Sequence, residues 1–536
     1  MQVSCEDART SLCYHCDYRF KHSVFNTDPI TSALRSNYYP TPAETEDVQR
    51  ALTLVEWNLK NMELEISRIR SIFDALLAHK MELERFQRHC ASAMAPIRKL
   101  PPELLRLIFM ACFDNKPDVI PVAGQVCRHW RDICVETPEL WSQVSVGRTR
   151  FGDHEKYRAL AALFLERSGT RPLGVTIREP VATGLLNVLV EQAQRWGSLK
   201  LAATHSTFYS SLSLDETEFP NLEKLEIVAL SPLMQTNLGG PPKKFTLPGA
   251  PNLRRVILKD ALVQWELPWR QLTHFQYDTP SVQDGLDVLE KCSGLLSCSL
   301  DRLLTLPLED SRSDPPPPRP LRLRHLTKLR LAIDTSGVVS NAQSLIRPFL
   351  TRIHAPRNLT SLELIGQYFP EDLLDFLARN DCRLEHLVLG TGYLKDESII
   401  QVLEALPLLR SLELDADIGT TRRIQNRVIT DKLLTRLIVY PESDTVLPSL
   451  ERFTLRTALN FDDQVLLDII ASRWEMWAVE VYGVPVAQIG EINLHFCGRR
   501  EHLQSDTIEQ LREYREDGLQ ITLRQGIDWV NLESSS

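Results

Sequence analysis

A pattern of apolar residues with the spacing L-x-x-L-x-L recurs along most of this 536-residue chain, from about residue 155 onward. Its last two apolar positions are separated by one residue, which is the period of a half-buried β-strand. Some copies carry another apolar residue in place of leucine. The copies are Trp196-Leu199-Leu201, Leu222-Leu225-Ile227, Leu253-Val256-Leu258, Leu272-Phe275-Tyr277, Leu295-Cys298-Leu300, Leu326-Leu329-Leu331, Leu359-Leu362-Leu364, Leu384-Leu387-Leu389, Leu409-Leu412-Leu414 and Leu450-Phe453-Leu455.

The copies begin at irregular intervals, mostly of about 20 to 33 residues, which is close to the period of leucine-rich repeats. In that architecture each copy supplies one strand, the strands stack as a parallel sheet, and helices cover the outer side. Helical periodicity between copies, as in 398–406 and 463–473, agrees with this arrangement. The sequence therefore predicts an irregular leucine-rich-repeat solenoid over 155–525, with a parallel sheet lining its concave face.

The ends and insertions of this region are also predicted. Residues 507–516 are expected to form one more helix and 519–523 one more strand, as a terminal capping repeat. The proline run 315–318 is typical of a stiff, exposed loop between two repeats. The last segment, 526–536, is expected to be a C-terminal tail whose final residues, 533–536, are frayed.

The N-terminal region has two different patterns. Residues 1–45 lack a clear period, so they are expected to be weakly ordered. Between 46 and 92, apolar residues recur in alternating steps of three and four, which predicts a coiled-coil-like helix. The seam over 48–83 should be buried against either a second copy of the chain or its own body, so a homodimer is one alternative. Its residues are Val48, Leu52, Val55, Leu59, Met62, Ile66, Ile69, Phe73, Leu76 and Leu83.

The segment 96–146 is expected to form three short helices. Pro101 and Pro102 suit a first helical turn, where a missing N–H group is tolerated. Apolar residues from Val122 to Cys134 predict a second amphipathic helix. Thr137 is a candidate N-cap for a third helix that contains Trp141. Because three short helices make a thin core on their own, burial against a partner should matter for this segment.

Three separated pieces of this segment carry a resemblance to a known family. They are L-P-P-E-L-L-R-L-I-F at 100–109, V-C-R-H-W-R at 126–131 and T-P-E-L-W at 137–141. In this order they resemble an F-box. The junction A-P-I-R-K-L-P-P-E at 95–103, followed by degenerate repeats, is similar to F-box proteins that are numerous in mushroom-forming fungi. Arg106-Leu107 departs from that family, which is often more polar there.

The resemblance implies a non-catalytic substrate receptor. An F-box docks on a Skp-family adaptor and, through it, on a cullin-RING ubiquitin ligase, while the repeats would bind a protein substrate. The alternative is a repeat and coiled-coil scaffold without a ligase. The residues that match the family's docking module are Leu100, Pro101, Pro102, Glu103, Leu104, Leu105, Ile108, Phe109, Val126, Cys127, Trp130, Leu140 and Trp141.

Composition argues against several other classes of protein. The formal net charge of −9 disfavours a nucleic-acid binder, which usually has a basic face. The apolar runs are too short to span a bilayer. Eleven cysteines without regular spacing fit reduced thiols, so the cytoplasm or the nucleus is the expected compartment.

Candidate catalytic and metal sites are weak. The sequence has no nucleophile elbow, phosphate-binding glycine loop or zinc-protease motif, so no enzymatic activity and no cofactor are expected. Cys13 and Cys16, with Cys5 upstream, lack the second cysteine pair that structural zinc usually needs, so no metal is expected. Four tryptophans among the repeats are expected to fill the core, and any on the concave face would be a candidate substrate contact. They are Trp265, Trp269, Trp474 and Trp477.

Overall fold

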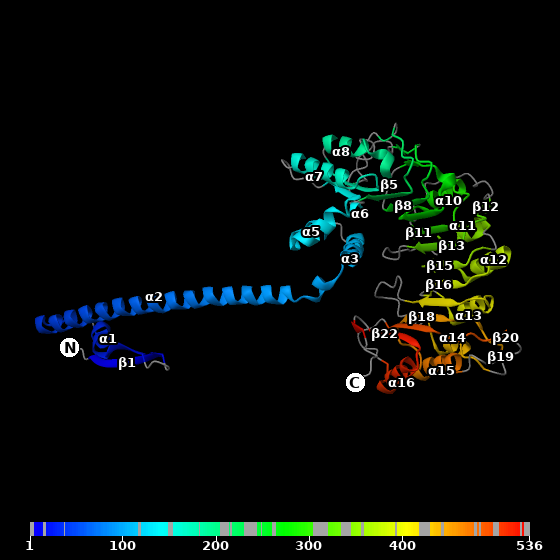
Figure 1. The fold of residues 1–536 in the computed structure, drawn as a ribbon. Helices are drawn as coiled ribbons and strands as arrows, with labels where there is room; N and C mark the ends of the chain where they lie inside the picture. The colour runs from blue at the N-terminus through cyan, green and yellow to red at the C-terminus, as the bar shows by residue number, and fades with distance from the viewer. Residues whose placement is uncertain are drawn as a thin grey trace. The chain divides into compact units, whose positions relative to one another are not determined.

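The chain forms two units, Met1–Leu105 and Arg106–Ser536. The structure is a computed structural model (Figure 1). It describes residues 5–13, 18–36, 38–115, 119–147, 154–181, 183–203, 214, 217–229, 244–247, 249–259, 264–303, 320–333, 345–354, 358–391, 394–416, 429–440, 444–475, 480–481, 484–496, 503–525 and 528–529.

The N-terminal segment has more regular structure than the sequence predicts. Strands β1 (Cys5–Cys13) and β2 (Tyr18–Phe25) form an antiparallel hairpin, and helix α1 (Asp28–Arg35) follows. The expectation of weak order over 1–45 is therefore corrected for the described residues. The hairpin packs on the next helix, where buried Asn58 accepts a hydrogen bond from the Ser23 N–H at 3.1 Å. Such tertiary packing leaves no period in the sequence.

Helix α2 (Pro42–Ala93) contains 52 residues. At the usual rise per residue of an α-helix, it is about 78 Å long. It begins with a capping box, in which the Thr41 N–H donates to the Glu44 carboxylate at 2.9 Å. Seven seam residues expose between 41% and 65% of their surface, so a long apolar stripe is open to solvent. The seven are Leu52, Leu59, Ile66, Ile69, Phe73, Leu76 and Leu83.

The segment 96–146 contains more helices than expected. A short 3-10 turn, η1 (Pro96–Lys99), precedes α3 (Pro102–Asn115), α4 (Val119–Val126), α5 (Arg128–Val135) and α6 (Pro138–Trp141). The single amphipathic helix predicted around 122–134 is broken at Cys127, which is extended with φ −160°. The apolar spacing stays in phase across this break, so the periodicity does not report it. Thr137 is extended before α6, as an N-cap residue should be.

A fifteen-stranded sheet forms the C-terminal unit (Figure 1). All neighbouring strands are parallel except the last pair, which is antiparallel. In sheet order the strands are β3 (Gln143–Val146), β4 (Leu173–Arg178), β5 (Trp196–Ala203), β6 (Lys224–Ala229), β8 (Arg255–Lys259), β10 (His274–Asp278), β11 (Ser297–Leu303), β13 (Lys328–Ile333), β15 (Ser361–Ile365), β16 (His386–Gly390), β17 (Ser411–Asp415), β18 (Arg452–Thr457), β21 (Glu491–Phe496), β22 (Gln520–Gln525) and β23 (Asp528–Trp529).

The ten predicted copies supply ten consecutive strands of this sheet, β5 to β18. Their two alternating apolar positions align across neighbours: Leu199 pairs with Leu225, and Leu201 with Ile227. The same register continues strand by strand, and these side chains are buried in one continuous core. The repeated pattern is therefore a ladder of stacked apolar side chains, which stabilises the sheet through burial.

Helices lie along one face of the sheet, as α10 to α15 do in Figure 1. The expected helices at 398–406, 463–473 and 507–516 correspond to α13, α15 and α16, and the expected strand at 519–523 corresponds to β22. The helices are α7 (His154–Arg167), α8 (Thr183–Val190), α10 (Val282–Lys291), α11 (Arg347–Arg352), α12 (Pro370–Asn380), α13 (Asp396–Glu404), α14 (Asp431–Arg436), α15 (Asp463–Trp474) and α16 (Ser505–Glu516).

Three parallel strands of the sheet were not predicted, and neither was the short antiparallel β23. β3, β4 and β21 carry Val144-Val146, Val175-Ile177 and Ile492-Leu494 at the aligned positions. Their β-branched residues obscure a leucine pattern. The sheet consequently begins at 143, inside the predicted helical segment, rather than at 155.

The remaining predictions concern the proline run and the C-terminal tail. The proline run 315–318 and the last residues, 530–536, lie outside the described residues. Within the predicted C-terminal tail, Asp528 and Trp529 form β23, which pairs with β22. The sheet therefore extends into the segment predicted as a tail, and the prediction of fraying concerns 533–536, which are not described.

Arg473 of α15 is fully buried and, among the described residues, contacts carbonyl groups rather than a carboxylate. Its guanidinium donates to the carbonyl oxygens of Leu437 at 2.9 Å, Val446 at 2.8 Å and Leu447 at 3.0 Å. Burial lowers the pKa of Arg473 to about 10. The side chain therefore ties an irregular stretch of backbone to the helix layer. Of the three carbonyls, that of Leu447 also accepts from the Leu450 N–H at 3.2 Å.

Replacing Arg473 by methionine should lower the free energy of unfolding by about 3 kcal/mol. The carbonyls of Leu437 and Val446 lose the Arg473 partner at a cost of roughly 1–3 kcal/mol each, and the removed cost of burying a charge offsets part of this. Urea unfolding of the full chain measures the change. Arg383 is exposed. The control Arg383→Met should therefore change the free energy of unfolding by less than about 0.5 kcal/mol. Equal stability of the two variants would contradict this role for Arg473.

Candidate functional site

Helix α3 separates its apolar side chains between two faces. Leu105 and Phe109, four residues apart, are 1% and 4% exposed. Leu104, Leu107 and Ile108 lie at the same helical spacing on another side and are 46%, 59% and 38% exposed. One stripe of the helix is therefore core, and the other presents leucine and isoleucine to solvent.

The next two helices repeat this division. Ala123 and Ile133 are buried, whereas Val122 and Val126 of α4 are 66% and 55% exposed. The rings of Phe109 and Trp130 lie 5.0 Å apart in a tilted arrangement, which joins α3 to α5. Helices α3 and α4 thus each carry exposed apolar side chains beyond a small packed core.

The predicted docking residues fall into three groups by exposure. Partly buried are Leu100, Cys127 and Trp130. Exposed are Pro101, Pro102, Glu103, Leu104, Ile108 and Val126. Buried are Leu105, Phe109, Leu140 and Trp141. The exposed group can contact another molecule directly, while the buried group acts through the fold.

Trp141 connects the helical segment to the sheet. Its Nε1–H donates to the Cys134 carbonyl at 2.7 Å. Its ring meets Phe164 of α7 edge-on at 4.9 Å, and the Arg167 guanidinium carbon lies 4.5 Å from the ring centre. The sequence did not single out Phe164 or Arg167, because neither lies in a motif. Trp141 is thus held between α5 and α7.

Further contacts make this junction continuous. Only Ser142 separates α6 from β3, the first strand of the sheet. Arg171 and Glu139 form an ion pair at 2.7 Å. The Arg106 Nε–H donates to the Thr137 hydroxyl at 3.2 Å, so the residue that departs from the family pattern has a structural role. Within the C-terminal unit, the helical segment and the sheet are joined without a linker.

The cysteines and the acidic side chains of the described residues are the groups whose placement decides whether a metal centre can form. Within the described ranges, no group of His, Cys, Asp and Glu side chains is placed to hold a metal ion. Cys16 lies outside those ranges, and Cys5 is exposed. Burial raises the pKa of the Cys134 thiol, which disfavours its reactive thiolate form. In the part of the chain that the structure describes, no helix has both the length and the apolar character needed to cross a membrane.

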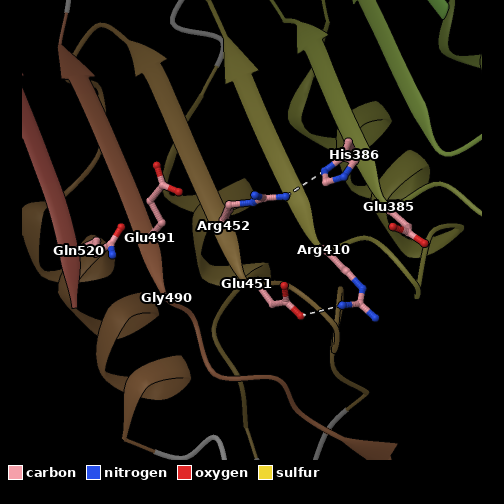
Figure 2. A pocket seen from close by; sticks show the side chains of 8 residues that line it. All are labelled: Glu385, His386, Arg410, Glu451, Arg452, Gly490, Glu491 and Gln520. Atoms are coloured by element: carbon pink, nitrogen blue, oxygen red, sulfur yellow. Dashed lines mark hydrogen bonds and ion pairs between the residues drawn. The ribbon is translucent and has the colours of Figure 1, made fainter. Parts of the chain in front are cut away.

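The sheet presents a second, polar surface. Figure 2 shows a shallow pocket near the beginnings of β16, β17, β18, β21 and β22, where one contact joins β18 to β16 across β17 and another joins the residues just before β17 and β18. Arg452 reaches His386 Nδ1 at 3.3 Å, and Arg410 pairs with Glu451 at 3.2 Å. The pocket is lined by Glu385, His386, Arg410, Glu451, Arg452, Gly490, Glu491 and Gln520.

The predicted tryptophan contacts are not on this surface as far as they are described. Trp269 and Trp474 are partly buried against the apolar core. The side chains of Trp265 and Trp477 lie outside the described set. The expectation of core filling therefore holds for the two that are described.

Substitutions at Trp141 should weaken the junction by graded amounts. Trp141→Phe removes the indole N–H and one ring of a buried bicycle, and should cost about 2 kcal/mol of unfolding free energy. Trp141→Ala also leaves a cavity and should cost about 3–5 kcal/mol. Chemical unfolding measures both. Trp57→Phe on the exposed face of α2, where the side chain is 60% exposed, is the control and should be close to neutral. If the Trp141→Ala chain were as stable as this control, Trp141 would not stabilise the junction between the helical segment and the sheet.

Comparison with known proteins assigns the helical segment. Residues 97–146 match the F-box-like family. No curated protein matches the chain. F-box domains generally bind Skp-family adaptors, so the match suggests a general role as a ubiquitin-ligase adaptor subunit. The chain contains an F-box-like domain that begins before α3 and ends with the first strand of the sheet.

Proposed function

We propose that this chain is the substrate-recognition subunit of a Skp/cullin/F-box ubiquitin ligase. The observation that supports this most is the F-box-like domain with apolar side chains exposed on α3 and α4. Its F-box docks on the Skp-family adaptor, and the sheet binds a protein substrate. The chain itself performs no chemistry and needs no cofactor.

Energetics support docking on a partner. Leu107, Ile108, Val122 and Val126 are each at least 38% exposed within a domain whose own core is small. Fully burying one such side chain is worth about 1.5–3 kcal/mol. Covering several of them would therefore supply much of the free energy of a stable complex, although association itself costs part of it.

The rest of the C-terminal unit fits a degenerate leucine-rich-repeat solenoid. Each aligned copy supplies one strand, and neighbouring helices pack in chain order from α11 to α16. In Figure 1 the sheet follows an arc with α10 to α15 outside it. A solenoid of this kind offers an extended concave face to a protein.

The mechanism follows from the junction at Trp141. A substrate held on the sheet and an adaptor held on the F-box would keep a fixed separation, because no flexible linker joins α6 to β3. The gain is a raised effective concentration of substrate near a ubiquitin-charged enzyme, which other subunits supply. Reduced cysteines suit a location in the cytoplasm or the nucleus.

Helix α2 supports a second proposal, homodimerisation. Its heptad seam is exposed, and coiled-coil seams are stable only when a facing helix covers them. A homodimer through 48–83 would present two F-boxes and two sheets. A scaffold that lacks ligase association would use the same seam, so adaptor binding separates the two alternatives.

Negative charge on the exposed face of α3 should weaken adaptor binding. Leu107→Glu combined with Ile108→Glu should weaken binding of a purified Skp-family adaptor by about 2 kcal/mol or more, roughly 30-fold. Both side chains are already exposed, so the fold should tolerate the change. Isothermal titration calorimetry measures the affinity. Leu408→Glu, at a position 51% exposed outside the F-box, is the matched control. Unchanged affinity in the double variant would exclude this face of α3 as the docking surface, and absence of adaptor binding by the wild-type chain would favour the scaffold.

Charge in the α2 seam should dissociate a homodimer. Ile69→Lys with Phe73→Lys places two cations in the seam, where each would be buried without a partner. Sedimentation equilibrium should show a shift from dimer to monomer. Leu64→Lys lies off the seam at a 63% exposed position and should leave the dimer intact. A wild-type chain that is already monomeric at micromolar concentration would refute the dimer.

A further inference from the structure

The first residues of successive strands form a row on the polar face of the sheet. They pair in register and alternate with the buried leucines, so they lie on the face opposite the core. None of them is buried. We call this set the basic row: Lys224, Arg255, His274, Ser297, Lys328, Ser361, His386, Ser411 and Arg452.

The basic row contains cations, histidines and serines, and no carboxylate. The first acidic residue in the same register is Glu491 on β21, beyond its end. Within the described ranges, Lys224, Arg255 and Lys328 make no ion pair, although the whole chain is acidic. Burial, followed by the charges of Arg255 and Lys328, lowers the pKa of His274. At Lys224, Arg255 and Lys328 no ion pair among the described residues therefore neutralises the positive charge, whereas Glu385, Glu451 and Glu491 lie near the Arg452 end of the row.

Further along the strands, the charges are neutralised by neighbours. Lys200 pairs with Glu226 at 2.8 Å. Arg330 pairs with Asp301 at 2.7 Å and also with Glu363. The contrast shows that this sheet does pair its charges where both signs are present. In the basic row the counter-charge must come from another molecule or from solvent ions.

The dimensions of the row suit an extended chain. Neighbouring strands of a sheet lie about 4.8 Å apart. Four such steps separate Lys224 from Lys328, and four more separate Lys328 from Arg452. Each half of the row therefore spans about 19 Å, on the order of 38 Å in total. An extended peptide rises about 3.3 Å per residue, so roughly twelve residues would cover the row.

We infer that the basic row binds an extended acidic segment of a protein, whose anionic groups are met by Lys224, Arg255 and Lys328. This rests on the proposed function, since the segment would belong to the ligase substrate. The serines between the cations can donate further hydrogen bonds to carboxylate or phosphate oxygens. Nucleic acid fits less well, because the row has no Phe, Tyr or Trp ring on which bases could stack.

Fluorescence anisotropy on the full chain tests the inference with defined probes. The probes are a labelled twelve-residue peptide of alternating Glu and Ala, its Gln counterpart, a phosphoserine version and a twelve-nucleotide single-stranded DNA. The Glu or phosphoserine peptide should bind at least tenfold more tightly than the Gln peptide, and its affinity should fall with salt. Tighter binding by the phosphoserine peptide would support the inference and identify phosphate as the preferred anion.

Variants locate the binding. Arg255→Glu with Lys328→Glu should lower the affinity for the acidic peptide at least tenfold. Arg270→Glu with Lys291→Glu makes the same change in net charge at exposed positions outside the row, and should change the affinity less than twofold. Equal loss in both variants, no acidic-peptide binding, or tighter binding of DNA than of peptide would overturn the inference.

Adaptor binding separates this inference from the proposed function. The Arg255→Glu and Lys328→Glu chain should bind the Skp-family adaptor with unchanged affinity, because the row lies outside the F-box-like domain. A chain that binds the peptide through the row but never binds the adaptor would retain the acidic-segment site and refute the ligase. A chain that binds the adaptor but not the peptide would retain the ligase proposal and refute the acidic-segment site.

Discussion

The ladder of paired apolar side chains across the parallel sheet is the interaction on which the C-terminal unit depends. Each strand contributes two buried residues in register with its neighbours, from Val144 and Val146 of β3 to Ile521 and Leu523 of β22. Because the strands are stacked in chain order, each one is held mainly by the strand before it and the strand after it. The last strand of the F-box-like domain, β3, is also the first strand of this sheet, so the apolar ladder begins within that domain.

The direct connection between the helical segment and the sheet limits how far the two can move relative to each other. A separate domain would be joined by an exposed linker, and its orientation would vary. Here β3 follows α6 after one residue, and Trp141 is clasped between α5 and Phe164. Under the proposed function, a fixed separation between adaptor and substrate would come from the sheet itself. Much of the predicted docking motif, including Leu105 and Leu140, is accordingly core that shapes the exposed residues around it.

The sequence was sufficient for features that repeat and poor for features that occur once. Ten strands and their register follow from a leucine period, because burial of the same positions is needed in every copy. The leucine period did not predict β3, β4 and β21, because valine or isoleucine replaces leucine at most of their aligned positions. The helix break at Cys127 kept the apolar phase, and the N-terminal hairpin depends on packing against Asn58, so neither leaves a local signal. In the site, the order of motifs located the domain, but only the structure distinguishes exposed Ile108 from buried Phe109.

The residues that alternate with the buried leucines, on the opposite face of the sheet, distinguish it from other sheets of this kind. The apolar ladder would form with many different residues on the opposite face, so the fold places little constraint on them. Their charges nevertheless follow a pattern. Lys200 and Glu226, in the middle of their strands, form an ion pair. Arg255 and Lys328, at the beginnings of their strands, make no ion pair among the described residues. Stability does not require that difference, because exposed ion pairs contribute little to folding. An unpaired row of one sign on an acidic protein is better explained by recognition of a molecule of opposite charge.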